Sequence, residues 1–351
     1  MRTLPVLFRI VAVSILASWT ILPAATGLLA QEDAQQKNIT AKLSEADKTA
    51  AKRADAGFLK AWRGNKPAAP VSSKLVARGS AARDASALKA LSASDDLQIR
   101  FPGDLDFHDG KVVEFAESHP IYLLPNGKCP IAKCWGDPAR FLRDIGKSEF
   151  IHVVDQYVGE VASNRYRLGD SASISYTPPA DPLTDDDMLA VVHAVASLTG
   201  ETGRRHIYHV FLAPGQDECF DSTFTICASN AFCAYHSSAT FEDIGHILYT
   251  VEPYENVIGC QVRPGTPNGT LIDSTNSALS HELIETITDP DGTGWWNSSA
   301  VVLFGEEIAD ECVFFVPPAF SDPSTIMANG HKYAIQSEYS NHDRGCIAEK
   351  Q

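Results

Sequence analysis

The clearest pattern of hydrophobic and polar positions in the chain predicts a helix from Thr184 to Gly200. Three aspartates in its first turn suit the positive end of a helix dipole, and glycine commonly ends a helix. His193 lies inside this pattern, where we expect a structural histidine rather than a ligand. Apolar residues follow one side of the helix at helical spacing: Met188, Leu189, Val191, Val192, Val195 and Leu198.

Shorter patterns predict the remaining elements. Asp137 to Ile145 is typical of a helix, because Asp137 suits the N-cap, Pro138 the first turn and Gly146 the end. No regular alternation of strands and helices is present, so the fold class is α+β with a mixed or antiparallel sheet. Apolar or alternating runs predict strands: Ile121–Leu124, Phe150–Val154, Ser171–Tyr176 at an edge, Ile207–Leu212 and Ile247–Val251.

Residues 280–289 predict a further helix, which Pro290 ends. At about 100° per residue, Leu279, Leu283 and Ile287 fall on one side of it. His281 and Glu285 fall on the opposite side, four residues apart and therefore neighbours on one face. The apolar side is expected to face the core, and the polar side to face a cleft or solvent.

The polar side of this helix carries candidate metal chemistry. His281 and Glu285 supply two ligands from one rigid element, and Glu282 follows the histidine directly. The layout resembles the zincin helix H-E-x-x-H with a carboxylate in place of the second histidine. This implies a zincin-like site with Zn²⁺, in which Glu282 is the catalytic general base.

The third metal ligand has more than one candidate. In the resemblance to gluzincins, a downstream glutamate is the ligand and a nearby aspartate orients a ligand histidine. Glu306 or Glu307, with Asp310 as the orienting residue, fits this spacing. Asp291 is a rival at the metzincin position. With two carboxylate ligands, the site also suits an ion harder than zinc.

His236 is a second supporting candidate, because it follows a cysteine-rich loop and is expected to line the cleft or to pack beside it. The chain holds 8 cysteines, an even number that predicts up to four disulfides in an exported protein. Cys129 and Cys134 are close enough to clip one loop, and Cys312 could join Cys346. Sequence leaves the connectivity open.

The N-terminus predicts export. Residues 1–30 have the order of a signal peptide: arginines, an uncharged apolar run and small residues. A membrane anchor is the alternative, but no other stretch has the ~20 apolar residues of a spanning helix. We expect a secreted, periplasmic or extracellular protein without stable membrane association after signal removal.

The two parts of the remaining chain differ in net charge. Residues 31–95 are rich in Ala and Lys and hold 12 Lys/Arg against 7 Asp/Glu, a balance of +5. Residues 96–351 hold 15 against 37, a balance of −22, which argues against nucleic acid as a partner. The first segment is interpreted as a spacer or as a pro-segment that docks on the acidic domain, and the second as the globular domain.

Several stretches resemble the phosphate-induced protein 1 (EXORDIUM-like) family, in its microbial branch. They are Phe232–His236, Pro267–Gly269, Ser280–Pro290 with its H-E-x-x-E form, Glu307–Cys312 and Tyr333–Cys346. The resemblance covers roughly residues 205–346 and implies secretion. It implies no established activity, so the chemistry rests on the residues themselves.

Together these patterns predict a disulfide-containing secreted α+β domain with a zincin-like mixed sheet and a motif helix. The function predicted first is a metal-dependent hydrolase, peptidase-like, with a peptide or protein as its substrate. The alternative is a non-enzymatic extracellular protein that binds or signals.

Overall fold

The computed structural model describes residues 36–62, 103–160, 165–298, 307–313 and 323–350. The chain divides into two units, Met1–Gln35 and Gln36–Gln351, and every element below belongs to the second. The predicted signal peptide therefore lies outside the described residues. Among those that are described, no helix is both long and apolar enough to cross a membrane.

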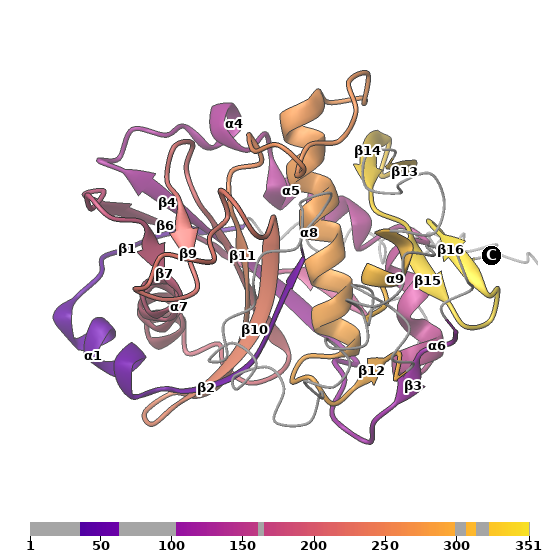
Figure 1. The fold of residues 1–351 in the computed structure, drawn as a ribbon, viewed down its shortest axis with the longest axis horizontal. Helices are drawn as coiled ribbons and strands as arrows, with labels where there is room; N and C mark the ends of the chain where they lie inside the picture. Colours follow the sequence, from indigo (N-terminus) through magenta and orange to yellow (C-terminus); the bar gives the residue numbers. More distant parts are fainter. Residues whose placement is uncertain (1–35, 63–102, 161–164, 299–306, 314–322, 351) are drawn as a thin grey trace, which may run out of the picture. The chain divides into compact units, whose positions relative to one another are not determined.

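The main sheet has eight strands and is mixed (Figure 1). Strand β10 runs antiparallel to both of its neighbours, whereas the other strand pairs described in this sheet are parallel. The predicted α+β class with a mixed sheet is confirmed. In sheet order the strands are β1 (Asn38–Ala41), β6 (Ser171–Tyr176), β4 (Ala116–Pro125), β8 (His206–Phe211), β11 (Gly245–Glu252), β10 (Ala234–Phe241) and β2 (Asp55–Trp62), with β5 (Tyr166–Leu168) beside β4.

Alternate residues of the central strands pack into two cores on opposite faces of the sheet. Ile121 and Tyr208 belong to one core, and Tyr122 and Ile207 belong to the other. Each face of the sheet is thus covered by helices. They are α1 (Glu45–Arg53) and α7 (Asp185–Thr199) at the first core, and α5 (Pro138–Ile145), η1 (Ile151–Val154), α6 (Asp155–Val158) and α8 (Thr270–Thr288) at the second.

Local sequence signals set the ends of α5 and α7 as predicted. Asp137 accepts a hydrogen bond from the backbone of Arg140, and proline occupies the first turn of α5. Thr184 and Asp187 form a capping box at the start of α7. Gly200 follows α7 with φ of 73°, a left-handed conformation that glycine adopts without strain.

Two strand predictions are wrong. Residues 151–154 form the 3-10 helix η1, because a short apolar run has the same pattern in a buried strand and a buried helix. Ser171–Tyr176 is a strand, β6, but it is not at the edge of the sheet. Strand β1 pairs with it and takes the edge.

The N-terminal basic segment contributes to this sheet. Residues 36–62, part of the stretch interpreted as a spacer or pro-segment, form β1, α1 and β2. Strand β2 pairs with β10, and Leu59 on β2 packs in the α7-side core. Residues 63–95 of that stretch lie outside the described residues.

Disulfides and small sheets complete the unit. The predicted pairs Cys129–Cys134 and Cys312–Cys346 are both present, and Cys219–Cys227 and Cys233–Cys260 complete the predicted four. These bonds suit an oxidising environment outside the cytosol. Short elements are α4 (Ile131–Cys134), α9 (Asp310–Val313), and the paired strands β3 (Asp106–Phe107) with β12 (Trp295–Trp296), β7 (Leu183–Thr184) with β9 (Glu218–Cys219), β13 (Ser324–Ala328) with β14 (His331–Ile335), and β15 (Glu338–Ser340) with β16 (Gly345–Ile347).

Candidate metal centre

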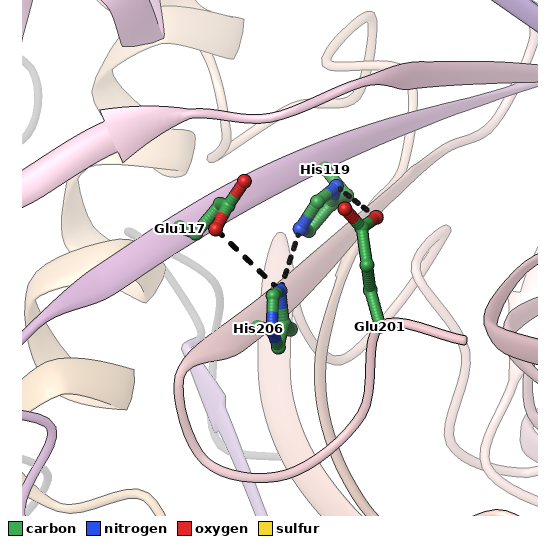
Figure 2. A group of neighbouring side chains, drawn as sticks. All are labelled: Glu117, His119, Glu201 and His206. Carbon is green, nitrogen blue, oxygen red and sulfur yellow. Dashed lines mark hydrogen bonds and ion pairs between the residues drawn. The ribbon is translucent and has the colours of Figure 1, made fainter. Parts of the chain in front are cut away.

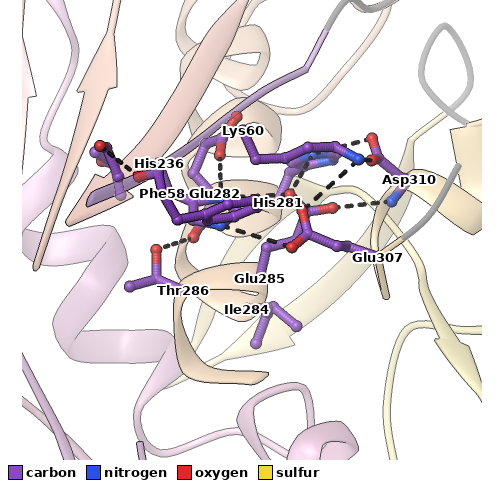
Figure 3. A network of polar contacts seen from close by, with 12 residues as sticks. Phe58, Lys60, His236, His281, Glu282, Ile284, Glu285, Thr286, Glu307 and Asp310 are labelled. Carbon is purple, nitrogen blue, oxygen red and sulfur yellow. Dashed lines mark hydrogen bonds and ion pairs between the residues drawn. The ribbon is translucent and has the colours of Figure 1, made fainter. Parts of the chain in front are cut away.

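Helix α8 buries its polar side as well as its apolar side. Leu279, Leu283 and Ile287 pack in the core beneath the sheet, as the angular pattern predicts. His281 and Glu285 on the other side are also fully buried, facing β10, β2 and α9 rather than solvent (Figure 3). Because buried charges are costly unless they are paired, this polar side requires compensation.

Two groups of potential metal ligands converge on this side of α8, and we call them together the α8 cluster. His281, Glu285 and Asp310 form one group, in which a ligand atom from each residue lies within 4.8 Å of the others. His236, Glu285 and Glu307 form the second group under the same limit. Glu285 belongs to both groups, so its carboxylate is the centre of the cluster.

The distances in the first group are short. His281 Nε2 lies 3.2 Å from Glu285 Oε2 and 3.7 Å from Asp310 Oδ1. The other ring nitrogen, Nδ1, lies 3.1 Å from Oε1 of Gln336, whose amide nitrogen donates to the carbonyl of Ala309. This orientation of the amide makes Nδ1 the donor and directs Nε2 toward the carboxylates, as in many metal sites.

The second group is held from β10. His236 Nδ1 lies 3.5 Å from Glu285 Oε2, and Nε2 lies 3.9 Å from Glu307 Oε1. Both carboxylate oxygens of Glu307 are buried, and the carboxyl lies beside Asp289 as well as His236 and, at 3.9 Å, Nζ of Lys60. An ion bound between these side chains would add positive charge beside two neighbouring carboxyl groups.

Carboxylates outnumber cations in this region. Burial raises the pKa of Glu282 and Glu307 well above its ordinary range, and the charge of Glu285 raises it further. Burial would also raise the pKa of Glu285, but His281 beside it lowers that pKa to about 2. Further buried carboxylates surround these residues: Glu252, Asp289 and Glu338. Such an excess of acidic groups fits a cation-binding site.

Glu282 is joined to the cluster through His236. Its Oε2 lies 3.1 Å from His236 Nδ1, and its Oε1 is buried without a hydrogen bond to the described residues. Burial lowers the pKa of His236 to about 4, so its ring is neutral at neutral pH. The predicted general base is therefore held by a neutral imidazole, beside the candidate ligands.

A lysine from the N-terminal basic segment also enters the α8 cluster. Lys60 on β2 places Nζ 2.9 Å from Asp310 Oδ2 and 3.9 Å from Glu307 Oε2. Sequence analysis missed this residue. The only available signal was the positive charge of residues 31–95, which does not indicate which lysine reaches the acidic domain.

Most of the predicted site residues lie in the α8 cluster. The structure brings His281, Glu285, Glu282, Glu307 and His236 together, and it adds Asp310 as a potential ligand rather than only an orienting residue. Glu306 lies outside the described residues. Asp291, the rival ligand, pairs instead with Arg204 at 2.7 Å and His246 at 3.2 Å.

Comparison with protein-family models, with curated proteins and with solved structures finds no match to this chain. The resemblance to the phosphate-induced protein 1 family and the zincin-like fold therefore remain predictions. Function has to be inferred from the site.

Proposed function

We propose that the chain is a secreted metal-dependent hydrolase whose metal is held by His281, Glu285 and Asp310. The observation that carries this proposal is the convergence of an imidazole and two carboxylates, fully buried, within 4.8 Å of one another. Three protein ligands are the usual complement of a catalytic zinc site. Glu307 and His236, grouped around the other side of Glu285, would hold the cluster in place or complete the ligand set.

The chemistry follows from the residues around those ligands. A divalent ion bound there would polarise a carbonyl group and lower the pKa of a bound water. Glu282 would accept the proton of the attacking water and pass it to the leaving group. His236 would hold the Glu282 carboxyl in position through the hydrogen bond at 3.1 Å.

The identity of the metal follows from the ligand types. Two carboxylates and one histidine make a harder site than two histidines and one carboxylate, so zinc and manganese are both candidates. The substrate class proposed is a peptide or protein, as in the zincins that the H-E-x-x-E helix resembles. Export is supported by the four disulfides, which suit an oxidising compartment.

The test combines metal content with hydrolysis of a fluorogenic peptide library by the purified full exported chain. Wild type is expected to carry about one catalytic metal per chain, and His281→Ala to lose it. Glu282→Gln keeps the shape of the side chain, so it should retain the metal and lose hydrolysis by about 10²-fold or more. Glu242→Gln, on an exposed residue between β10 and β11, is the matched control and should behave as wild type.

A second candidate function is a non-enzymatic extracellular protein that binds or signals. The observation that favours it is the ammonium of Lys60, which lies 2.9 Å from Asp310 and already compensates the charge of that carboxylate. If wild type retains no more metal than His281→Ala after zinc and manganese are offered, and no peptide is cleaved, the hydrolase proposal is abandoned in favour of this role.

A further inference from the structure

A second group of histidines and glutamates lies at the other core, on the face of the sheet that α7 covers. Glu117 and His119 are on β4, His206 is the first residue of β8, and Glu201 is in the turn after α7 (Figure 2). We call these four residues the β4–β8 cluster. It shares no residue with the α8 cluster.

The placement follows from strand register. Glu117 and His206 are partners across the parallel β4–β8 pair. Glu117 and His119 alternate with Ser118, which hydrogen-bonds His209 on the α8 side of the sheet. Residues 117 and 119 therefore project from the opposite face, where the turn after α7 brings Glu201 beside them.

The ligand atoms of the β4–β8 cluster have the spacing of a metal site. His119 Nε2 lies 3.0 Å from His206 Nδ1, at hydrogen-bond distance, and the other ring nitrogen, Nδ1, lies 3.3 Å from the carbonyl oxygen of Asp170 and 3.4 Å from Glu201 Oε2. An ion would bind one of these two ring nitrogens and displace its present contact. Glu117 Oε2 lies 3.8 Å from His206 Nδ1. One ligand atom from each of the four residues falls within 4.8 Å of the others. Ligands around a tetrahedral zinc ion are roughly 3.4 Å apart, by geometry from bonds of about 2.0–2.2 Å.

The chemical state of these groups suits a metal. Burial lowers the pKa of His119 to about 4, and it also lowers the pKa of His206. A neutral imidazole has the lone pair that a metal requires. Oε2 of Glu201 is a buried atom that makes no hydrogen bond to a described residue. A bound cation would satisfy it.

The positively charged side chains around the β4–β8 cluster lie beside one of its members, Glu117. Arg167 donates to Glu117 Oε2, and Arg205 Nε lies 3.8 Å from the same oxygen. Among the described residues, no arginine or lysine forms an ion pair with Glu201. Packing also fixes His119, because a Cβ on Gly169 would lie 2.3 Å from its Cε1. The imidazole ligand is therefore held in place before any ion binds.

We propose that Glu117, His119, Glu201 and His206 form a second divalent-metal site, for an ion of the zinc class, that is independent of the α8 cluster. Imidazole nitrogens with carboxylate oxygens are the donor set that zinc accepts. Four protein ligands leave no open position for a substrate, so this site is structural. It fastens the turn after α7 to the first residues of β4 and β8.

The test titrates the metal-free full exported chain with Co²⁺, followed by visible absorption and equilibrium dialysis. His281→Ala is expected to retain a tetrahedral Co²⁺ spectrum, and His206→Ala in that background to abolish it. Glu201→Gln, on a partly exposed side chain that retains its shape, should weaken this binding about tenfold or more, because loss of a direct ligand costs at least as much as loss of a residue that supports one. His342→Ala, an exposed histidine outside both clusters, is the matched control.

A second readout does not depend on the spectrum. Zinc should raise the melting temperature of the His281→Ala chain, because a ligand that binds only the folded state stabilises it. It should not do so in His281→Ala/Glu201→Gln at the same zinc concentration. The proposal is overturned if His281→Ala binds no Co²⁺, or if His206→Ala and Glu201→Gln, each added to His281→Ala, bind it as His281→Ala/His342→Ala does. Neither result depends on whether the α8 cluster is catalytic.

Discussion

The ammonium nitrogen of Lys60 lies 2.9 Å from Oδ2 of Asp310, although the two residues are 250 positions apart in the chain (310 − 60). One belongs to the basic N-terminal segment and the other to the acidic domain. The basic segment and the acidic domain therefore form an ion pair inside the α8 cluster. The Asp310 carboxylate is also a candidate metal ligand, so the lysine ammonium and a metal ion would compete for it.

Replacement of this lysine is expected to strengthen metal binding. Lys60→Met removes a positive charge beside Asp310 and Glu307 while it keeps most of the apolar stem, so a divalent ion meets less repulsion. We expect the Kd for zinc or manganese to fall about tenfold, equivalent to ~1.4 kcal/mol, in a competition titration with a chromophoric chelator. Lys48→Met, in an exposed pair with Glu45, is the control. Unchanged or weaker binding in Lys60→Met would show that the lysine does not compete.

The ion pair between Asp155 and Arg165 predicts a loss of stability in acid. Burial alone would raise the pKa of Asp155, but Lys350 and Arg165 hold it below its ordinary value. A carboxyl whose pKa is lower in the folded state contributes stability at pH values above the unfolded pKa, about 3.9, and loses it as pH falls through the folded pKa. Urea unfolding at pH 7 and at pH 3 measures this loss.

The variant Asp155→Asn isolates that contribution. It leaves the buried guanidinium of Arg165 without its carboxylate, which should cost about 3–5 kcal/mol at pH 7. The gap between variant and wild type should narrow at pH 3, because that pH lies below the unfolded pKa of about 3.9 and the carboxyl contributes less stability there. A gap of the same size at both pH values would mean that packing, not charge, accounts for the loss. Asp137→Asn, at an exposed cap, is the control.

The disulfide Cys233–Cys260 should support the α8 cluster as well as the fold. It joins residues 27 positions apart and precedes His236 by three residues (236 − 233). Replacing both cysteines by serine should reduce the free energy of unfolding by about 3 kcal/mol and weaken metal binding. The same change at Cys129–Cys134, only 5 positions apart, should cost less and leave the metal in place. Equal effects of the two changes on metal content would contradict this link.

The basic segment is expected to stay with the mature protein at least from Gln36. Strand β2 pairs with β10 along most of its length and supplies Lys60 to the cluster. Removing it would expose an edge of the sheet and leave the carboxylates without that cation. N-terminal sequencing of the exported protein should therefore give a start at or before residue 36. A start beyond residue 62 would instead support a pro-segment that is cleaved.

Sequence predicted the features that depend on neighbouring residues. The caps of α5 and α7, the apolar side of α8 and the close cysteine pair at residues 129 and 134 all follow from local patterns. Features that depend on distant residues were missed or misjudged. Strand β1 is only 4 residues long and has no strong pattern of its own, so β6 was placed at the edge.

The same limit applies to the candidate site. The spacing of His281 and Glu285 on one helix is visible in the sequence, as is the later carboxylate group. Burial of the polar side of α8 is not, because it depends on β2 and β10 covering that side. The approach of Lys60 and the histidine–glutamate group on β4 and β8 likewise depend on strand register, which the sequence leaves open.

The α8 cluster is assembled from residues that are far apart in the chain, and the ribosome synthesises them at different times. Contacts between distant stretches form slowly, and a chain emerges from its N-terminus during synthesis. Lys60 is made well before Glu307 and Asp310. A product that stops before residue 307 has the strands of the main sheet and lacks both of these carboxylates. A complete cluster therefore requires a chain that extends at least to residue 310.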